Sequence, residues 1–128
     1  MPEIKFDIGD ITGLMREAWD NSEVHGFHEP ISRDGVVRDA SVGERLLLTV
    51  EELIEAWSHY RDGRDITEIF EVEKADGTTK PDGFPIEMAD AVIRLAEMCE
   101  HYGIPLQEAL VIKTEFNRGR PFRHGRII

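Results

Sequence analysis

Four amphipathic stretches, each with its own start or stop signal, most constrain how this chain can fold. Ser41 and Glu44 have the spacing of a helix capping box, and Pro85 and Pro105 suit the first turn of a helix. Gly103 suits a helix end. Because apolar residues recur at helical spacing between these signals, the sequence predicts helices over residues 11–25, 42–61, 85–102 and 105–118.

The connections between the predicted helices carry weaker signals. Residues 26–40 show no sustained period, so we expect a loop there. Residues 64–84 alternate briefly before Asp76-Gly77, which predicts a small hairpin or an extended arm. A length of 128 residues suits one domain. We therefore expect one all-α domain over residues 1–128, with 64–84 as an insertion and 119–128 as a basic tail.

Charge is distributed unevenly along the chain. The formal net charge is −11, but residues 113–128 carry five Lys or Arg against one acid, so the rest of the chain is near −15. A body this acidic repels a phosphate backbone, which argues against binding to nucleic-acid polymers. No apolar run approaches the length of a membrane span. Cys99 is the only cysteine, which is compatible with a reducing cytoplasm, so we expect a cytoplasmic protein without membrane association.

Two acidic pairs are the candidate metal ligands. Glu52 and Glu55 lie three residues apart in the second predicted helix, and Glu87 and Asp90 have the same spacing in the third. Residues three apart share a helix face, so four carboxylates would converge if the two faces met. Hard cations such as Mg²⁺ prefer carboxylate oxygens, and such a cluster would need a cation to offset its repulsion.

Spacing alone favours a plainer interpretation of these pairs. Glu52, Glu55 and His59 lie opposite the apolar stripe of their helix, as a solvated face would. Acidic residues in a first helical turn are also favoured by the helix dipole without any function. The five histidines show no metal-ligand spacing such as HExxH, so no zinc site is predicted.

The fourth predicted helix carries two polar residues on an apolar line. Lys113 and Asn117 continue the spacing of Leu106 and Leu110. Either the helix leaves the core by its third turn and Lys113 reaches water, or the two side chains point at a phosphate or a base. The tail adds several arginines, among them Arg120, which suit either solvent or an acidic partner.

With these residues in view, the chain resembles the MazG-like branch of the all-α nucleoside triphosphate pyrophosphohydrolases. The family pattern of a Glu-x-x-Glu pair followed by a Glu-x-x-Asp pair is similar to VEELIEAW and GFPIEMADAVIRL, and the family's ending resembles EALVIKTEFNRGRPFRHG. The resemblance covers roughly residues 41–126. The 31 residues between Glu55 and Glu87 exceed the connection in compact members, so the insertion must loop out.

The resemblance implies a four-helix-bundle-like fold and Mg²⁺-dependent hydrolysis of a nucleoside triphosphate, NTP or dNTP, to a monophosphate and pyrophosphate, with Mn²⁺ as an alternative ion. It assigns metal binding to the four acidic residues and catalysis to Glu52 and Glu55, with Glu52 also orienting the water. It also implies an oligomer, and because four helices of this length have a limited core, we expect a homodimer or homotetramer. The residues expected to hold substrate are Lys113, Asn117, Arg120 and, by stacking on the base, Trp57; Trp19 and Phe27 are further stacking candidates.

Two other functions fit the same residues. The first is hydrolysis of a different pyrophosphate-linked metabolite on the same scaffold. The second is a non-catalytic helical interaction protein, whose acidic stripes are only solvated and whose basic tail binds a partner. A di-iron bundle fits less well, because those sites favour Glu-x-x-His spacing and neither acidic pair has it.

Overall fold

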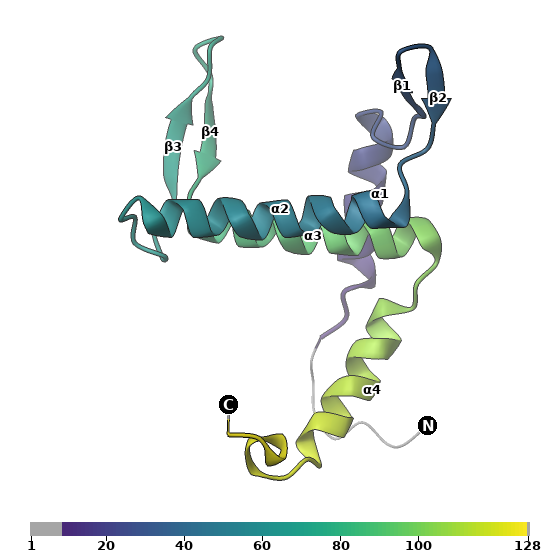
Figure 1. The fold of residues 1–128 in the computed structure, drawn as a ribbon, viewed down its shortest axis with the longest axis vertical. Coiled ribbons are helices and arrows are strands. Elements are labelled where there is room, and N and C mark those ends of the chain that lie inside the picture. Colours follow the sequence, from purple (N-terminus) through teal and green to yellow (C-terminus); the bar gives the residue numbers. More distant parts are fainter. Residues whose placement is uncertain (1–8, 128) are drawn as a thin grey trace.

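The computed structural model describes residues 9–127, with the backbone alone at residues 124 and 125 (Figure 1). Residues 1–8 and Ile128, which belong to the predicted domain and tail, lie outside the described part. The four predicted helices are confirmed to within one residue at every end. The observed helices are α1 (Thr12–Val24), α2 (Val42–Arg61), α3 (Phe84–Tyr102) and α4 (Leu106–Arg118), followed by the 3₁₀ turn η1 (Phe122–Gly125).

Local chemistry sets several of these helix ends. The Ser41 hydroxyl accepts a hydrogen bond from the Glu44 backbone N–H, and the Glu44 carboxylate accepts one from the Ser41 N–H, which completes the capping box of α2. Pro85 lies in the first turn of α3, and Gly103 ends that helix in the left-handed region at φ 66°. These interactions span only a few residues, which is why the sequence predicts the ends of these helices.

The predicted all-α class is wrong, because residues 9–127 also form two antiparallel hairpins. Residues 26–40, expected as a loop, include strands β1 (Ile31–Arg33) and β2 (Val36–Arg38). The turn between them places Asp34 at φ 51° and Gly35 at φ 76°, the conformation that hairpin turns require. Every residue of these short strands is exposed, so no alternation of apolar and polar residues marks them in the sequence. The fold is therefore mixed, with helices and two small sheets.

The second hairpin lies inside residues 64–84. Strands β3 (Phe70–Glu73) and β4 (Thr79–Asp82) pair with Phe70 opposite Asp82. The chain then enters α3 through Gly83, whose φ is 119° and where an added Cβ would lie 2.5 Å from the Glu68 carbonyl oxygen. This close passage places Asp82 directly before the first turn of α3.

The helices pack in an open arrangement. Helices α2 and α3 lie side by side and antiparallel, α1 crosses near the C-terminal part of α3, and α4 leaves that end of α3 in a different direction (Figure 1). The buried core between α1 and α3 is small and made of Met15, Ala18, Ala96 and Cys99, with Ile11 and Leu106 at its edge. The antiparallel α2–α3 pair, rather than this core, positions the acidic residues.

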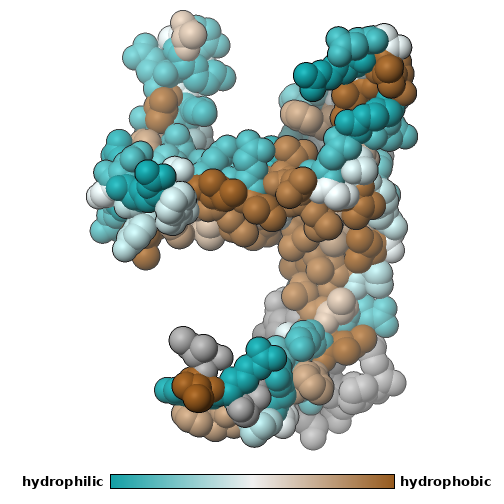
Figure 2. Space-filling view, viewed as in Figure 1, coloured by the Kyte–Doolittle hydropathy of each residue, from teal (hydrophilic) through white to brown (hydrophobic). Residues whose placement is uncertain are grey.

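Helix α2 turns its apolar stripe outward. Glu52 is only 7% exposed and Ala56 1%, whereas Val50 and Leu53 are 45% and 47% exposed. The plainer interpretation of Glu52 as part of a solvated outer face is therefore wrong. Figure 2 shows hydrophobic residues along α2 on the molecular surface. Within residues 9–127, no helix combines the length and apolar character needed to span a membrane.

Candidate metal centre

Three acidic side chains from α2 and α3 converge where the two helices pack. Glu52, Glu87 and Asp90 each place one carboxylate oxygen within 4.8 Å of the others. Glu52 and Glu87 are buried, and Asp90 is partly exposed. Glu55, the fourth predicted ligand, is exposed and hydrogen-bonds to the Glu87 carboxyl group. The structure thus brings together both predicted acidic pairs.

Two further side chains extend this cluster. The Nε2 atom of His59 lies 3.0 Å from Oδ1 of Asp82 and 3.4 Å from Oε1 of Glu87. The three groups offer ligand atoms within 4.8 Å of one another, so they could also hold an ion. Sequence analysis missed both residues as ligands. His59 is one turn beyond Glu55 on the same helix face, so its spacing could have indicated it. Asp82 has no such spacing, because the β3–β4 hairpin brings it to the site.

Glu87 holds a proton near neutral pH. Burial, followed by hydrogen bonds with Glu52, Glu55 and Asp82, raises the pKa of Glu87 to about 8. Burial and the negative charge of Glu52 also raise the pKa of Asp90 above its usual range. Glu87 therefore keeps its proton near neutral pH because it is buried beside other acidic groups.

Glu52 is stabilised as the charged form by a neighbouring arginine. The Nε atom of Arg94 donates to Oε1 of Glu52 at 2.6 Å. Burial opposes ionisation of Glu52 and is the largest single effect, but hydrogen bonds with Arg94, Glu87 and Glu55 and the charge of Arg94 together outweigh it, so the pKa of Glu52 lies below its usual range. Glu55 differs, because burial and the charge of Glu52 leave its pKa raised. The two glutamates therefore differ in basicity despite sharing one helix face.

The predicted phosphate-binding residues lie elsewhere in the chain. Lys113 and Asn117 are exposed on α4, and Arg120 is partly buried just beyond it. The Lys113 Nζ atom lies 4.8 Å from the centre of the Phe116 ring, and the Arg120 guanidinium lies 5.5 Å from the same ring. Because α4 leaves the C-terminal end of α3 while Glu87 lies in its first turn, one chain does not bring these residues to the carboxylates (Figure 1).

The predicted stacking residue Trp57 also points away from the carboxylates. Trp57 is 53% exposed on the apolar stripe of α2, and the Arg61 guanidinium covers its ring at 4.6 Å. At about 100° per residue, Trp57 is roughly 140° around the helix from Glu52. Of the other stacking candidates, Phe27 is exposed and Trp19 stacks on His28.

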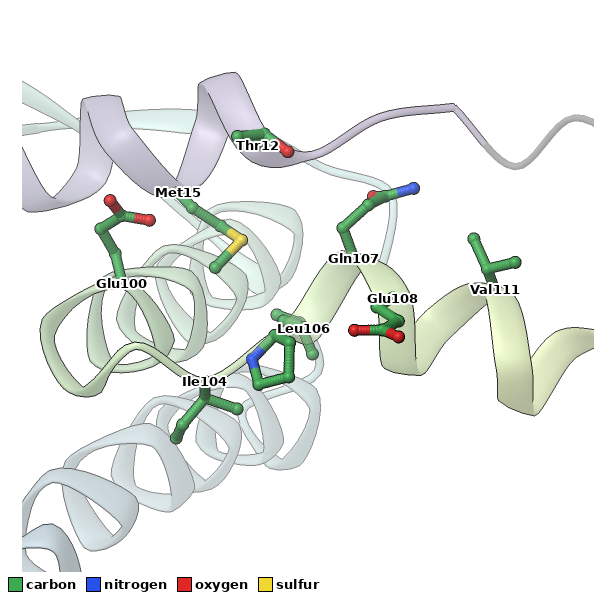
Figure 3. Close-up of a pocket in the computed structure, with 9 residues that line it drawn as sticks. Thr12, Met15, Glu100, Ile104, Leu106, Gln107, Glu108 and Val111 are labelled. Carbon is green, nitrogen blue, oxygen red and sulfur yellow. The ribbon is translucent and has the colours of Figure 1, made fainter. Parts of the chain in front are cut away.

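A separate cavity of about 530 Å³ lies between α1, the end of α3 and the start of α4 (Figure 3). Among the described residues of its lining, the charged side chains are Glu100 and Glu108, and two acids disfavour a phosphate ligand there. Gln107 at its edge accepts a hydrogen bond from the Ile11 N–H and donates one to the Gly9 carbonyl oxygen, so it ties α4 to the start of α1. The cavity is lined by Thr12, Met15, Glu100, Ile104, Pro105, Leu106, Gln107, Glu108 and Val111.

Comparison with known proteins adds nothing to this geometry. No protein family, curated protein or solved structure matches the chain.

Proposed function

We propose that this protein is a Mg²⁺-dependent nucleoside triphosphate pyrophosphohydrolase, which hydrolyses an NTP or dNTP between its α and β phosphates. The observation that carries the proposal is the convergence of Glu52, Glu87 and Asp90 from two packed helices, with Glu55 at its edge. The resemblance of the two acidic pairs and of the α4 ending to MazG-like enzymes supplies the reaction.

The donor set fits a hard divalent cation. Its ligand atoms are carboxylate oxygens, which Mg²⁺ and Mn²⁺ both accept. Glu87 retains a proton to about pH 8, and a cation would replace that proton as the offsetting charge. The residues that would hold the ion are Glu52, Glu55, Glu87 and Asp90. A bound divalent ion supplies neutralisation of phosphate oxygens and a lower pKa for a water molecule.

Glu55 is the better candidate for accepting a proton from the attacking water. Its pKa is raised and its side chain is open to solvent, whereas Arg94 holds Glu52 in the charged form. We therefore assign the general base to Glu55, while Glu52 binds the metal ion and helps to orient the water.

A second copy of the chain would complete the substrate site. Every residue of α4, all of them described, is at least partly exposed, and so is the apolar stripe of α2. The chain exposes 9808 Å², whereas a compact monomer of 14.6 kDa exposes about 6,900 Å². A homodimer or homotetramer would bury this excess and could carry Lys113, Asn117 and Arg120 of one subunit to the carboxylates of another.

Product analysis tests the reaction. Incubation with each common NTP and dNTP and Mg²⁺ should release a monophosphate and pyrophosphate together. Glu55→Gln should abolish release without loss of helix content, while Glu51→Gln, which changes the exposed neighbouring residue, should retain activity. Full activity in Glu55→Gln would contradict the assignment.

Two other results would favour the alternatives. Products other than pyrophosphate with a monophosphate would indicate hydrolysis of a different pyrophosphate-linked metabolite. If calorimetry detects no mutually dependent binding of Mg²⁺ and a nonhydrolysable nucleotide, the chain is a helical interaction protein and the proposal is withdrawn.

Mixed oligomers test the shared site. Glu55→Gln and Lys113→Ala chains should each be inactive, but a dimer containing one of each keeps one intact site. Random mixing in equal amounts should therefore recover about a quarter of wild-type activity if the dimer is the active unit. Sedimentation of the unmodified chain should show a dimer or tetramer, and a monomeric active species would refute the shared site.

We place the reaction in the cytoplasm, where nucleotides are available and the single, buried Cys99 stays reduced. Fractionation of cells producing the chain tests this location.

A further inference from the structure

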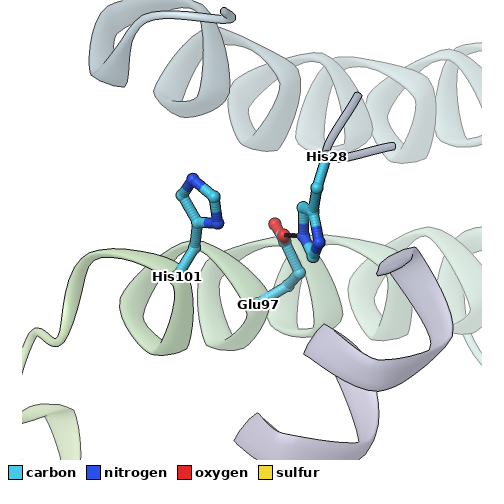
Figure 4. Close-up of side chains that lie close together, drawn as sticks. All are labelled: His28, Glu97 and His101. Atoms are coloured by element: carbon cyan, nitrogen blue, oxygen red, sulfur yellow. Dashed lines mark hydrogen bonds and ion pairs between the residues drawn. The ribbon is translucent and has the colours of Figure 1, made fainter. Parts of the chain in front are cut away.

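A second cluster of ligand-type side chains lies at the other end of α3. His28 comes from the segment after α1, and Glu97 and His101 come from successive turns of α3. Each offers one ligand atom, and the three atoms lie within 4.8 Å of one another. Figure 4 shows the two imidazole rings on either side of the Glu97 carboxylate. Glu97 is ten residues beyond Glu87, about 15 Å along the helix, so the cluster is separate from the carboxylate centre.

We propose that His28, Glu97 and His101 form a binding site for a transition-metal ion of the Zn²⁺ class, which ties the segment after α1 to α3. Two imidazole nitrogens and one carboxylate oxygen are the donors that such ions favour, whereas Mg²⁺ favours oxygen donors alone. Three protein ligands leave the remaining coordination position to water, which suits an ion at an accessible surface.

His28 is already oriented for this role. Its Nδ1 atom lies 2.6 Å from Oε2 of Glu23, and its Nε2 atom contacts Oε1 of Glu97. A carboxylate behind a metal-binding imidazole is the usual arrangement that fixes its ring and tautomer. The His28 side chain is only 7% exposed, and its ring stacks on Trp19 with 4.8 Å between ring centroids and on His101 with 4.9 Å. The ring therefore needs little rearrangement to present Nε2 to an ion.

The contact between Nε2 of His28 and Oε1 of Glu97 needs a proton or a cation that both atoms can share. Carboxylate oxygens accept but do not donate, so the Nε2 contact requires either a proton or a metal ion. Nδ1 of the same ring already meets the Glu23 carboxylate, so Nδ1 keeps its own proton. A divalent ion replacing the second proton would satisfy Nε2 and Glu97 together.

His101 supplies the third donor from an exposed position on α3. Its Nδ1 atom accepts a 3.4 Å hydrogen bond from the Trp19 indole, so the lone pair of the neutral ring is on that nitrogen, and an ion bound there would displace this long hydrogen bond. Burial, followed by the positive charges of Arg45 and His28, holds the pKa of His101 below its usual range, which favours the neutral, metal-binding form. Arg45, whose Nη1 lies 3.7 Å from Oε1 of Glu97, is a neighbouring cation that opposes the ion.

Zinc titration of the full chain tests the site. The protein is stripped of metals, held in excess Mg²⁺ to occupy the carboxylate centre, and titrated with Zn²⁺ against a chromogenic chelator. One equivalent should bind per chain. His101→Ala and His28→Ala should each weaken binding more than tenfold, and Glu23→Gln at least tenfold. The matched control is His25→Ala, an exposed histidine three residues before His28, which should bind Zn²⁺ as the wild type does.

A second readout uses the unmodified chain, so that misfolding of a variant cannot decide the outcome. Imidazole NMR signals from two of the five histidines should shift on addition of one equivalent of Zn²⁺. Glu87→Gln should leave this response intact, which separates it from the proposed nucleotide site. The proposal is overturned if Zn²⁺ binding survives both His28→Ala and His101→Ala, if Glu87→Gln removes it, or if no equivalent binds.

Discussion

Magnesium binding to the carboxylate centre should depend steeply on pH. With its pKa raised to about 8, Glu87 carries a proton at neutral pH, and an incoming ion must displace that proton. The apparent Kd should then increase by about tenfold between pH 9 and pH 7, and by about another tenfold at pH 6. Affinity should be highest above pH 8, where Glu87 is ionised before the ion arrives.

Calorimetry in buffers of different ionisation enthalpy measures this linkage directly. Mg²⁺ binding should release about 0.9 protons per site at pH 7 and about 0.5 at pH 8. Glu87→Gln, which has no proton to release and one ligand fewer, should show neither strong binding nor proton release. A wild-type Kd that changes less than twofold between pH 6 and pH 9, with no proton release, would refute the trapped proton as the barrier to binding.

In the metal-free chain, the proton on Glu87 stabilises the folded state, although it opposes Mg²⁺ binding. Because the folded-state pKa of Glu87 is raised from its ordinary 4.5 to about 8, its contribution to stability is fully present below pH 4.5 and is lost as pH rises through 8. Over that interval the loss is up to about 1.4 kcal/mol per pH unit. Thermal unfolding in chelator should show Tm falling with pH in the wild type, with a flatter profile in Glu87→Gln.

Three substitutions test the scaffold. Gly83→Ala places a Cβ 2.5 Å from the Glu68 carbonyl oxygen at φ 119°, so denaturant unfolding should show a loss of about 1–3 kcal/mol, and calorimetry should show weaker Mg²⁺ binding. Ser41→Ala removes half of the α2 capping box and should lower stability by about 1 kcal/mol while Mg²⁺ affinity stays unchanged. Ala96→Leu overfills a position only 1% exposed between α1 and α3 and should cost about 1–3 kcal/mol in the same unfolding assay. Wild-type stability in any of these variants would contradict the packing or cap on which its prediction rests.

Local signals predicted the helices and, as one of two alternatives, the β3–β4 hairpin, whereas the β1–β2 hairpin was missed. The capping box of Ser41 and the left-handed Gly103 act within a few residues, so their effect can be inferred without knowing the rest of the fold. The turn at Asp34-Gly35 is equally local, but its strands are exposed on every residue and show no alternation. Without a buried face, a strand has no hydrophobic period to detect.

Part of the candidate site was predictable because helical spacing is also a short-range effect. Spacing placed Glu52 with Glu55 and Glu87 with Asp90 on single helix faces. It could not place Asp82, which depends on the β3–β4 hairpin and the close passage at Gly83.

The sequence by itself determined four helices, their ends and the grouping of acidic residues on two of them, because capping and helical period are short-range effects. Only the tertiary structure decided that the acidic face of α2 turns inward against α3 while its apolar stripe stays outside. A helical period distinguishes two faces of a helix, but it does not show which face packs against a neighbouring helix and which is exposed to solvent. Only the tertiary structure also joined His28 to Glu97, 69 residues apart, because no spacing rule connects side chains across that distance in the chain.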